Sequence, residues 1–162
     1  VVKAYVTRVG EGPMPTEIDG SLGQEIAKKG GEIGATTGRP RRGGWVDAVS
    51  VKRIIQSNSV SALCLTKIDV LDGLENIKIC TGYDEDESKK AFAECMELED
   101  VNPSYIEIEG WLEPTAGINN YDDFPKKAKN FVEKISEVCG VPVDIVSTGP
   151  DNASTILINQ EI

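Results

Sequence analysis

An amphipathic segment late in the chain, built around a regular apolar stripe, limits the fold more than any other feature. Its apolar residues recur at spacings of three and four, which predicts one buried face on a helix over residues 124–138. These residues are Ala128, Phe131, Val132, Ile135 and Val138. Asp122 or Asp123 can cap the start of this helix, and Pro125 fits its first turn. A helix of this length needs an apolar surface to pack on.

Strand patterns elsewhere in the chain indicate what that surface is. Gly140 and Pro142 end the helix, and residues 143–146 follow as a short apolar strand. Further strands are predicted over residues 1–9, 60–65, 75–83, 105–111 and 155–158, with residues 105–111 as a half-exposed antiparallel strand. Further helices are predicted over residues 20–29 and 45–56, with a short one around 91–96. Strands and helices therefore mix as an α/β fold, in one domain over residues 1–162.

The charge of the chain argues against two classes of partner. The formal net charge is -10 and the sequence pI is about 4.5, so the overall field repels nucleic acid and anionic membranes. The apolar runs are too short to span a bilayer. The chain begins with Val1 inside a strand pattern, which suggests a piece of a longer polypeptide.

The thiols indicate a reducing compartment. The four cysteines are widely spaced, and they are Cys64, Cys80, Cys95 and Cys139. Without a C-x-x-C pair or any histidine, a zinc site is not expected. Buried free thiols in the cytoplasm are favoured over disulfides.

A basic stretch interrupts this acidic chain. Residues 36–42 read Thr-Thr-Gly-Arg-Pro-Arg-Arg and run into Gly43, Gly44 and Trp45. Arginine presents a planar charged fork that suits carboxylate and phosphate. Pro40 excludes a helix interior, and an extended backbone would place Arg39 and Arg41 on one side. The stretch is either an anion-binding loop or a solvated basic loop.

Two loops that follow strands offer further candidates. Lys67 and Asp69 lie two residues apart after the strand at residues 60–65, so they are expected to point to the same side. A carboxylate there can accept hydrogen bonds from the N1–H and the exocyclic amine of guanine, although a surface ion pair is the alternative. The turn over residues 147–150, Ser-Thr-Gly-Pro, could line a base or a phosphate, or simply precede a hairpin. The phosphate-loop pattern G-x-x-x-x-G-K-S/T does not occur.

Four blocks of the sequence, taken together and in this order, resemble the adenylosuccinate synthetase family. They are residues 8–17 (RVGEGPMPTE), 34–45 (GATTGRPRRGGW), 65–73 (LTKIDVLDG) and 140–151 (GVPVDIVSTGPD). The match covers nearly all of the chain and is weakest across residues 84–130. It resembles the C-terminal part of the family, whose mixed-sheet fold is related to that of P-loop NTPases.

The resemblance implies GTP- and Mg²⁺-dependent ligation of L-aspartate to inosine monophosphate (IMP), giving adenylosuccinate, the committed step towards AMP. It implies a cytoplasmic homodimer. The residues implied in aspartate and IMP binding are Val9, Ala35, Thr36, Thr37, Gly38, Arg39, Pro40 and Arg41. Those implied in GTP binding are Arg41, Lys67, Ile68, Asp69, Ser147, Thr148, Gly149 and Pro150.

The family's catalytic groups do not match any part of this sequence. Its Gly-rich phosphate loop, catalytic aspartate and catalytic histidine, with the Mg²⁺ ligands, belong to an N-terminal half. Because this chain contains no histidine, residues 1–162 alone are expected not to turn over. The alternative function is a guanine-nucleotide-binding module without catalysis.

Overall fold

The computed structural model describes residues 1–34, 38–83 and 101–158. Its largest sheet has the order β1–β5–β8–β9, from β1 (Val2–Lys3), β5 (Leu63–Thr66), β8 (Val143–Ser147) and β9 (Thr155–Leu157). The first three strands are parallel, and β9 is antiparallel to β8. Because parallel strands end at one edge of a sheet, the segments that follow β5 and β8 lie at the same edge.

The remaining described strands form two smaller sheets. β2 (Val6–Arg8) pairs antiparallel with β3 (Arg42–Gly44). β6 (Asn76–Tyr83) pairs in parallel with β4 (Val46–Asp47) and antiparallel with β7 (Pro103–Glu109). The α/β fold with mixed sheets is therefore confirmed.

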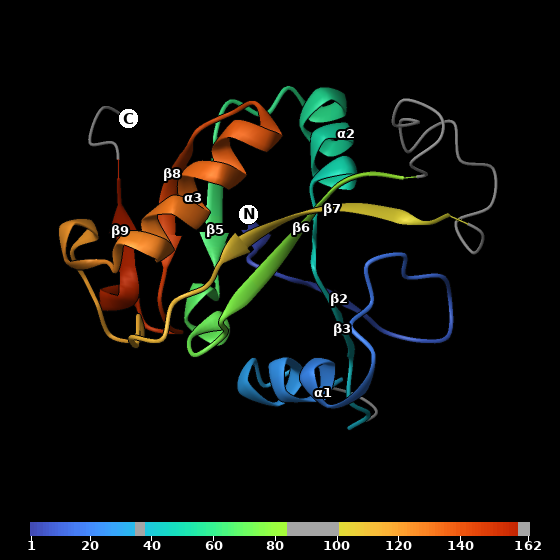
Figure 1. The fold of residues 1–162 in the computed structure, drawn as a ribbon. Helices are drawn as coiled ribbons and strands as arrows, with labels where there is room; N and C mark the ends of the chain where they lie inside the picture. Colours follow the sequence, from blue (N-terminus) through green and yellow to red (C-terminus); the bar gives the residue numbers. More distant parts are fainter. Residues whose placement is uncertain (35–37, 84–100, 159–162) are drawn as a thin grey trace.

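The α-helices of the described residues pack around these sheets (Figure 1). They are α1 (Gly20–Lys29), α2 (Ala48–Asn58) and α3 (Lys126–Cys139). In Figure 1, α3 crosses over β5 and β8, whereas α1 lies apart from them beside β3. Short 3₁₀ segments are η1 (Ile68–Leu71), η3 (Tyr121–Asp123) and η4 (Asn152–Ser154).

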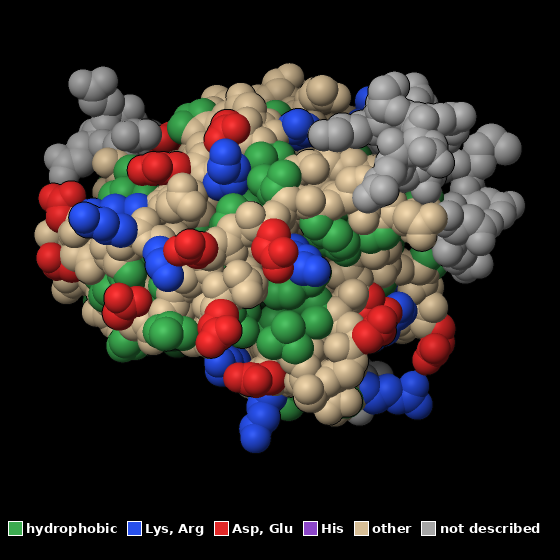
Figure 2. Space-filling model, in the orientation of Figure 1, with side chains coloured by type: hydrophobic (Ala, Val, Ile, Leu, Met, Phe, Trp, Pro, Cys, Tyr) green, Lys and Arg blue, Asp and Glu red, His purple; other side chains and the backbone are tan. Residues whose placement is uncertain are grey.

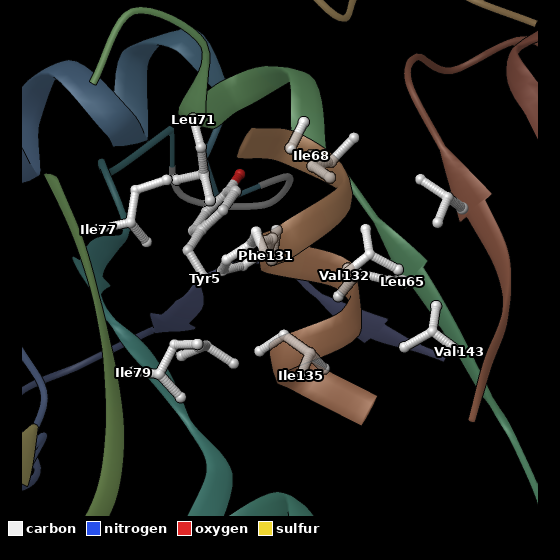
Figure 3. Close-up of a cluster of buried hydrophobic side chains, with 14 of the residues drawn as sticks. Tyr5, Leu65, Ile68, Leu71, Ile77, Ile79, Phe131, Val132, Ile135 and Val143 are labelled. Carbon is white, nitrogen blue, oxygen red and sulfur yellow. The ribbon is translucent and has the colours of Figure 1, made fainter. Parts of the chain in front are cut away.

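The core forms where α3 meets the strands (Figure 3). Phe131 and Ile135 of α3 are buried together with Leu65 of β5 and Ile79 of β6. The ring of Trp111 packs on Phe131 with centroids 5.7 Å apart. The apolar stripe predicted for the last helix is therefore confirmed, and Gly140 ends that helix with a positive φ of 77°.

Three predictions of secondary structure were wrong in detail. Residues 1–9 form two strands in different sheets, because the chain turns at Ala4 and Tyr5, which are both buried. Helix α3 begins after Pro125 without a side-chain cap from Asp122 or Asp123.

The second helix also begins later than predicted. Asp47 caps α2 by accepting a hydrogen bond from the Ser50 N–H, so Trp45 lies outside the helix. The apolar side chain of Ile54 in this helix is 56% exposed, whereas Ile55 is buried. The short helix predicted around 91–96 lies outside the described residues.

The described thiols are Cys64, Cys80 and Cys139, and all three are free. Burial raises the pKa of Cys80 to about 12 and that of Cys139 to about 11, so both stay protonated. On the face shown in Figure 2, acidic and basic side chains are interspersed. Among the described residues, no helix is long and apolar enough to cross a membrane.

Candidate functional site

Backbone contacts join the described residues on either side of residues 35–37. Ile33 and Pro40 form an antiparallel bridge, and the Arg41 N–H donates to the Glu32 carbonyl at 2.9 Å. Gly38 has a φ of 64°, which favours glycine. The predicted residues Ala35, Thr36 and Thr37 lie outside the described residues. We call the described residues 32–34 and 38–41 the arginine hairpin.

The arginines that follow one another in this stretch have different acidic partners. Arg41 Nη1 donates to Glu32 Oε2 at 2.9 Å, whereas Arg42 forms a two-pronged ion pair with Glu17. The Arg41 Nε is buried with no hydrogen-bond partner among the described residues. Arg39 and Pro40 are exposed. Arg41 thus keeps a donor that a ligand could use.

The β2–β3 pair brings the loop after β2 to the arginine hairpin. Arg8 lies opposite Arg42 in the register, and the Arg42 Nη1 donates to the carbonyls of Gly10 and Gly12 at 3.2 and 2.7 Å. Val9, at the start of this loop, is 67% exposed. The structure therefore places Val9 near the same end of β3 as the hairpin.

The backbone after β5 is not extended, so the reason given for placing Lys67 and Asp69 on one side was wrong. Lys67 is left-handed, with a φ of 59°, and Asp69 lies in the 3₁₀ segment η1. The Lys67 ammonium turns back and donates to the Gly30 carbonyl at 2.7 Å and to Glu32 Oε1 at 2.8 Å. Its charge is thus directed towards the arginine hairpin.

The carboxylate of Asp69 is the acidic group of this second candidate loop. Its Oδ1 is buried and accepts no hydrogen bond within the described part of the chain. Burial raises the pKa of this carboxyl, and the nearby charge of Asp72 raises it further. An unsatisfied buried acceptor is costly, so a ligand with two adjacent N–H donors would be stabilised there.

The third loop lies at the same sheet edge as Lys67. The register pairs Leu65 with Val146, so the chain leaves β5 and β8 at adjacent points. Ser147 Oγ donates to the Gly149 carbonyl at 2.8 Å, and the Thr148 hydroxyl donates to the Ile118 carbonyl at 2.9 Å. Thr148 is 1% exposed, so its hydroxyl shapes the turn, while Pro150 is exposed.

Glu32 joins two of the three candidate loops. It accepts hydrogen bonds from Lys3, Tyr5, Arg41 and Lys67 although its side chain is 1% exposed. Burial by itself would raise the pKa of Glu32, but the hydrogen bonds from Lys3, Lys67 and Tyr5 lower it from 4.5 to about 2. One carboxylate thus faces three cations, and the local charge is positive within a chain of net charge -10.

A pocket of about 590 Å³ opens between α1 and the arginine hairpin. Pro40 and Arg41 line it, together with Glu17, Lys28 and Arg42. Of the described residues, Lys67, Asp69 and those of the 147–150 turn do not line the pocket. The pocket therefore belongs to the arginine hairpin, and the loops at Lys67 and at residues 147–150 lie outside it.

Comparison with known proteins identifies the family. The family model described as adenylosuccinate synthetase matches residues 1–156. The chain belongs to the adenylosuccinate synthetase family. The relative from Nitrosomonas eutropha is 50% identical over 163 residues, and the one from Buchnera aphidicola is 49% identical over 160 residues. These matches cover 98% of this chain but only 38% and 37% of the relatives.

A solved structure extends the match to three dimensions. The fully ligated adenylosuccinate synthetase from Plasmodium falciparum superposes with a TM-score of 0.89 at 34% identity. The superposition covers 98% of this chain and 39% of that chain. The chain therefore spans well under half the length of the synthetases that it matches.

Two buried clusters of this synthetase chain were missed by reasoning from sequence. Glu32 was not singled out, because its partners Lys3 and Lys67 lie 29 and 35 residues away. Asp72 was also missed, although it accepts hydrogen bonds from Trp111 Nε1 at 2.6 Å and Thr115 N–H at 2.7 Å. The one available signal was the position of Glu32, an acid seven residues before the first arginine of the basic stretch.

The expected cofactors of a synthetase fit this chain unequally. Within the described residues, the buried Asp69 Oδ1 and Arg41 Nε have no hydrogen-bond partner, so they could meet a base and an anion, as GTP would require. Within residues 1–34, 38–83 and 101–158, no three metal-binding side chains converge.

Proposed function

We propose that this chain supplies the aspartate loop and the guanine pocket of an adenylosuccinate synthetase. The overall reaction joins L-aspartate to IMP and converts GTP to GDP and phosphate. The base oxygen of IMP first receives the γ-phosphoryl group, and the aspartate amine then displaces it as phosphate. Family membership supports this proposal, and the buried unpartnered Oδ1 of Asp69 is the observation that carries it.

On the guanine side, Asp69 accepts from the N1–H and the exocyclic amine of the base. Adenine lacks this donor pair, so the contact selects GTP. The stem of Lys67 lies along the face of the base while its ammonium stays on Glu32. Ile68 and the turn over residues 147–150 complete the pocket.

On the arginine side, the hairpin receives the anionic groups. Thr37 and Arg39 bind the carboxylates of aspartate, with Ala35, Thr36, Gly38 and Pro40 forming the loop around them. Arg39 also lies against IMP, and Val9 borders its ribose. Arg41 donates to the GTP phosphates. The positive charge around Glu32 favours all of these anions.

Catalytic groups and Mg²⁺ ligands are assigned to the part of a synthetase that this chain does not cover. Mg²⁺ neutralises charge on the transferring phosphoryl group when bound. The protein is further proposed to be a cytoplasmic homodimer. Residues 1–162 alone are then inactive, because positioning of substrates does not replace the missing acid, base and metal.

The test is a rate assay on two proteins. One is residues 1–162, and the other, called the full-length protein below, carries this chain within a synthetase as long as the relatives. Adenylosuccinate formation from IMP, aspartate and GTP is expected only from the full-length protein. Failure of the full-length protein to form adenylosuccinate would refute the proposed function, and turnover by residues 1–162 would refute the assignment of catalysis elsewhere.

A further inference from the structure

The carboxylate of Glu32 accepts hydrogen bonds from four side chains. Oε1 accepts from Lys3 Nζ at 2.8 Å, Tyr5 Oη at 2.7 Å and Lys67 Nζ at 2.8 Å. Oε2 accepts from Arg41 Nη1 at 2.9 Å. Lys3 belongs to β1, Tyr5 to the turn after it, Arg41 to the arginine hairpin and Lys67 to the end of β5.

The side chain of Glu32 is almost fully buried, whereas its cationic partners remain partly open. The side chain of Glu32 is 1% exposed, but those of Arg41 and Lys67 are 32% and 37% exposed. Removing one partner of a buried ion pair leaves the other charges uncompensated. Glu32 therefore acts on a ligand through the positions of its partners.

The conformation of Lys67 shows that its position is imposed. A lysine with a φ of 59° is uncommon and costs free energy, and the ammonium is fixed at both Glu32 and the Gly30 carbonyl. Gly30 leaves room for this arrangement, since an added Cβ would lie 2.0 Å from the Tyr5 hydroxyl. The direction of the Lys67 stem thus depends on Glu32.

We propose that Glu32 is a positioning residue that sets the distance between the phosphate-binding and guanine-binding ends of one GTP molecule. Arg41 and Lys67 serve opposite ends of the nucleotide, and Glu32 is the group that contacts both. This inference rests on the proposed function. Loss of the carboxylate would let Arg41 and Lys67 repel each other and separate.

The experiment measures the KM for GTP and the Kd for GDP of the full-length protein and its Glu32→Gln variant. Glutamine keeps the size of the side chain but removes the charge. Both constants are expected to rise about tenfold or more, the effect of losing a charge-assisted contact. The matched control is Glu109→Gln, which removes the same charge from an exposed ion pair with Lys127, outside the candidate loops. It should leave the GTP constants within about twofold.

A double-mutant cycle separates positioning from general stabilisation. If Glu32 acts through Lys67, the Glu32→Gln and Lys67→Met variant should lose little more GDP affinity than the worse single variant. Additive losses, or equal losses in Glu109→Gln, would overturn the inference. Should Glu32→Gln fail to fold, Glu32→Asp keeps the charge and shortens the reach, and unchanged GTP constants in that folded variant would overturn it.

If the proposed function itself is wrong, the experiment gives a different result than if only the role of Glu32 is wrong. The unsubstituted protein would then form no adenylosuccinate and bind no GDP, which removes both proposals. Turnover with the same KM for GTP in a folded Glu32→Gln variant removes only the role of Glu32.

Discussion

The indole nitrogen of Trp111 donates a 2.6 Å hydrogen bond to Asp72 Oδ1, which links the end of β7 to the segment after η1. The same carboxylate accepts from the N–H and the hydroxyl of Thr115, each at 2.7 Å. Trp111 and Thr115 are fully buried. Asp72 thus anchors the 111–118 segment, whose Ile118 carbonyl in turn holds Thr148 of the candidate guanine pocket.

Substitution of Asp72 is therefore expected to destabilise the protein. Asp72→Ala leaves the Trp111 and Thr115 donors buried without an acceptor, at a cost of about 3 kcal/mol or more. Urea unfolding of the full-length protein measures this loss. The control is Asp123→Ala at an exposed position, which should change stability by about 0.5 kcal/mol or less. Equal stability of the two variants would show that Asp72 anchors nothing.

Gly30→Ala tests the close packing around Glu32. The new methyl group would lie 2.0 Å from the Tyr5 hydroxyl, so Tyr5 or the turn must move. A loss of about 1–3 kcal/mol of stability is expected. Gly43→Ala is the matched control, because its nearest neighbouring atom is 3.4 Å away. Thermal unfolding compares the two, and a Gly30→Ala protein as stable as the control would contradict the packing described.

The low pKa of Glu32 predicts how its contribution to stability depends on pH. Its pKa is about 2 in the folded chain against an ordinary value of 4.5. A lowered carboxyl pKa stabilises the folded state above pH 4.5, and this stabilisation is lost as the pH falls towards 2. The difference in unfolding free energy between the unsubstituted protein and Glu32→Gln should therefore shrink over that interval. A difference that is constant with pH would contradict the ionised state of Glu32.

The raised pKa of Asp69 predicts a pH dependence of nucleotide binding. Only the ionised carboxylate accepts both guanine donors, so GDP affinity should fall as the pH drops through the pKa of Asp69. Because burial raises that pKa, the fall begins above the ordinary value of 3.8. Calorimetric titration at several pH values measures it, and Asp69→Asn should remove this part of the pH dependence. The same pH dependence in Asp69→Asn would assign it to another group.

Much of the fold followed from local patterns, whereas the contacts between loops did not. The limits of α1 were predicted to the residue, and the stripe of α3 was identified because its spacing is regular. The break at Ala4 and Tyr5 was not, because it depends on Tyr5 reaching Glu32, 27 residues later. The alternation of apolar and polar residues over residues 1–9 does not reveal a partner so far along the chain.

The candidate site was likewise predicted from the sequence only in part. The sequence identified the loops after β5 and β8 and the arginine hairpin, since strand ends and charge are visible locally. The left-handed backbone of Lys67 and the ion pair that directs it towards Glu32 were not visible. Both result from packing of α1 against η1, which brings Gly30 to Lys67.

The most direct test of the account is the KM for GTP of the full-length Asp69→Asn variant. Loss of the charge-assisted contact to guanine should cost about 1.5–3 kcal/mol, roughly a ten- to a hundredfold rise in KM. The KM values for IMP and aspartate should change little. The matched control is Asp151→Asn, which removes the same charge at an exposed position after the 147–150 turn and should leave the KM for GTP unchanged. A KM for GTP that is the same in Asp69→Asn as in the unsubstituted protein would contradict the assignment of the guanine pocket.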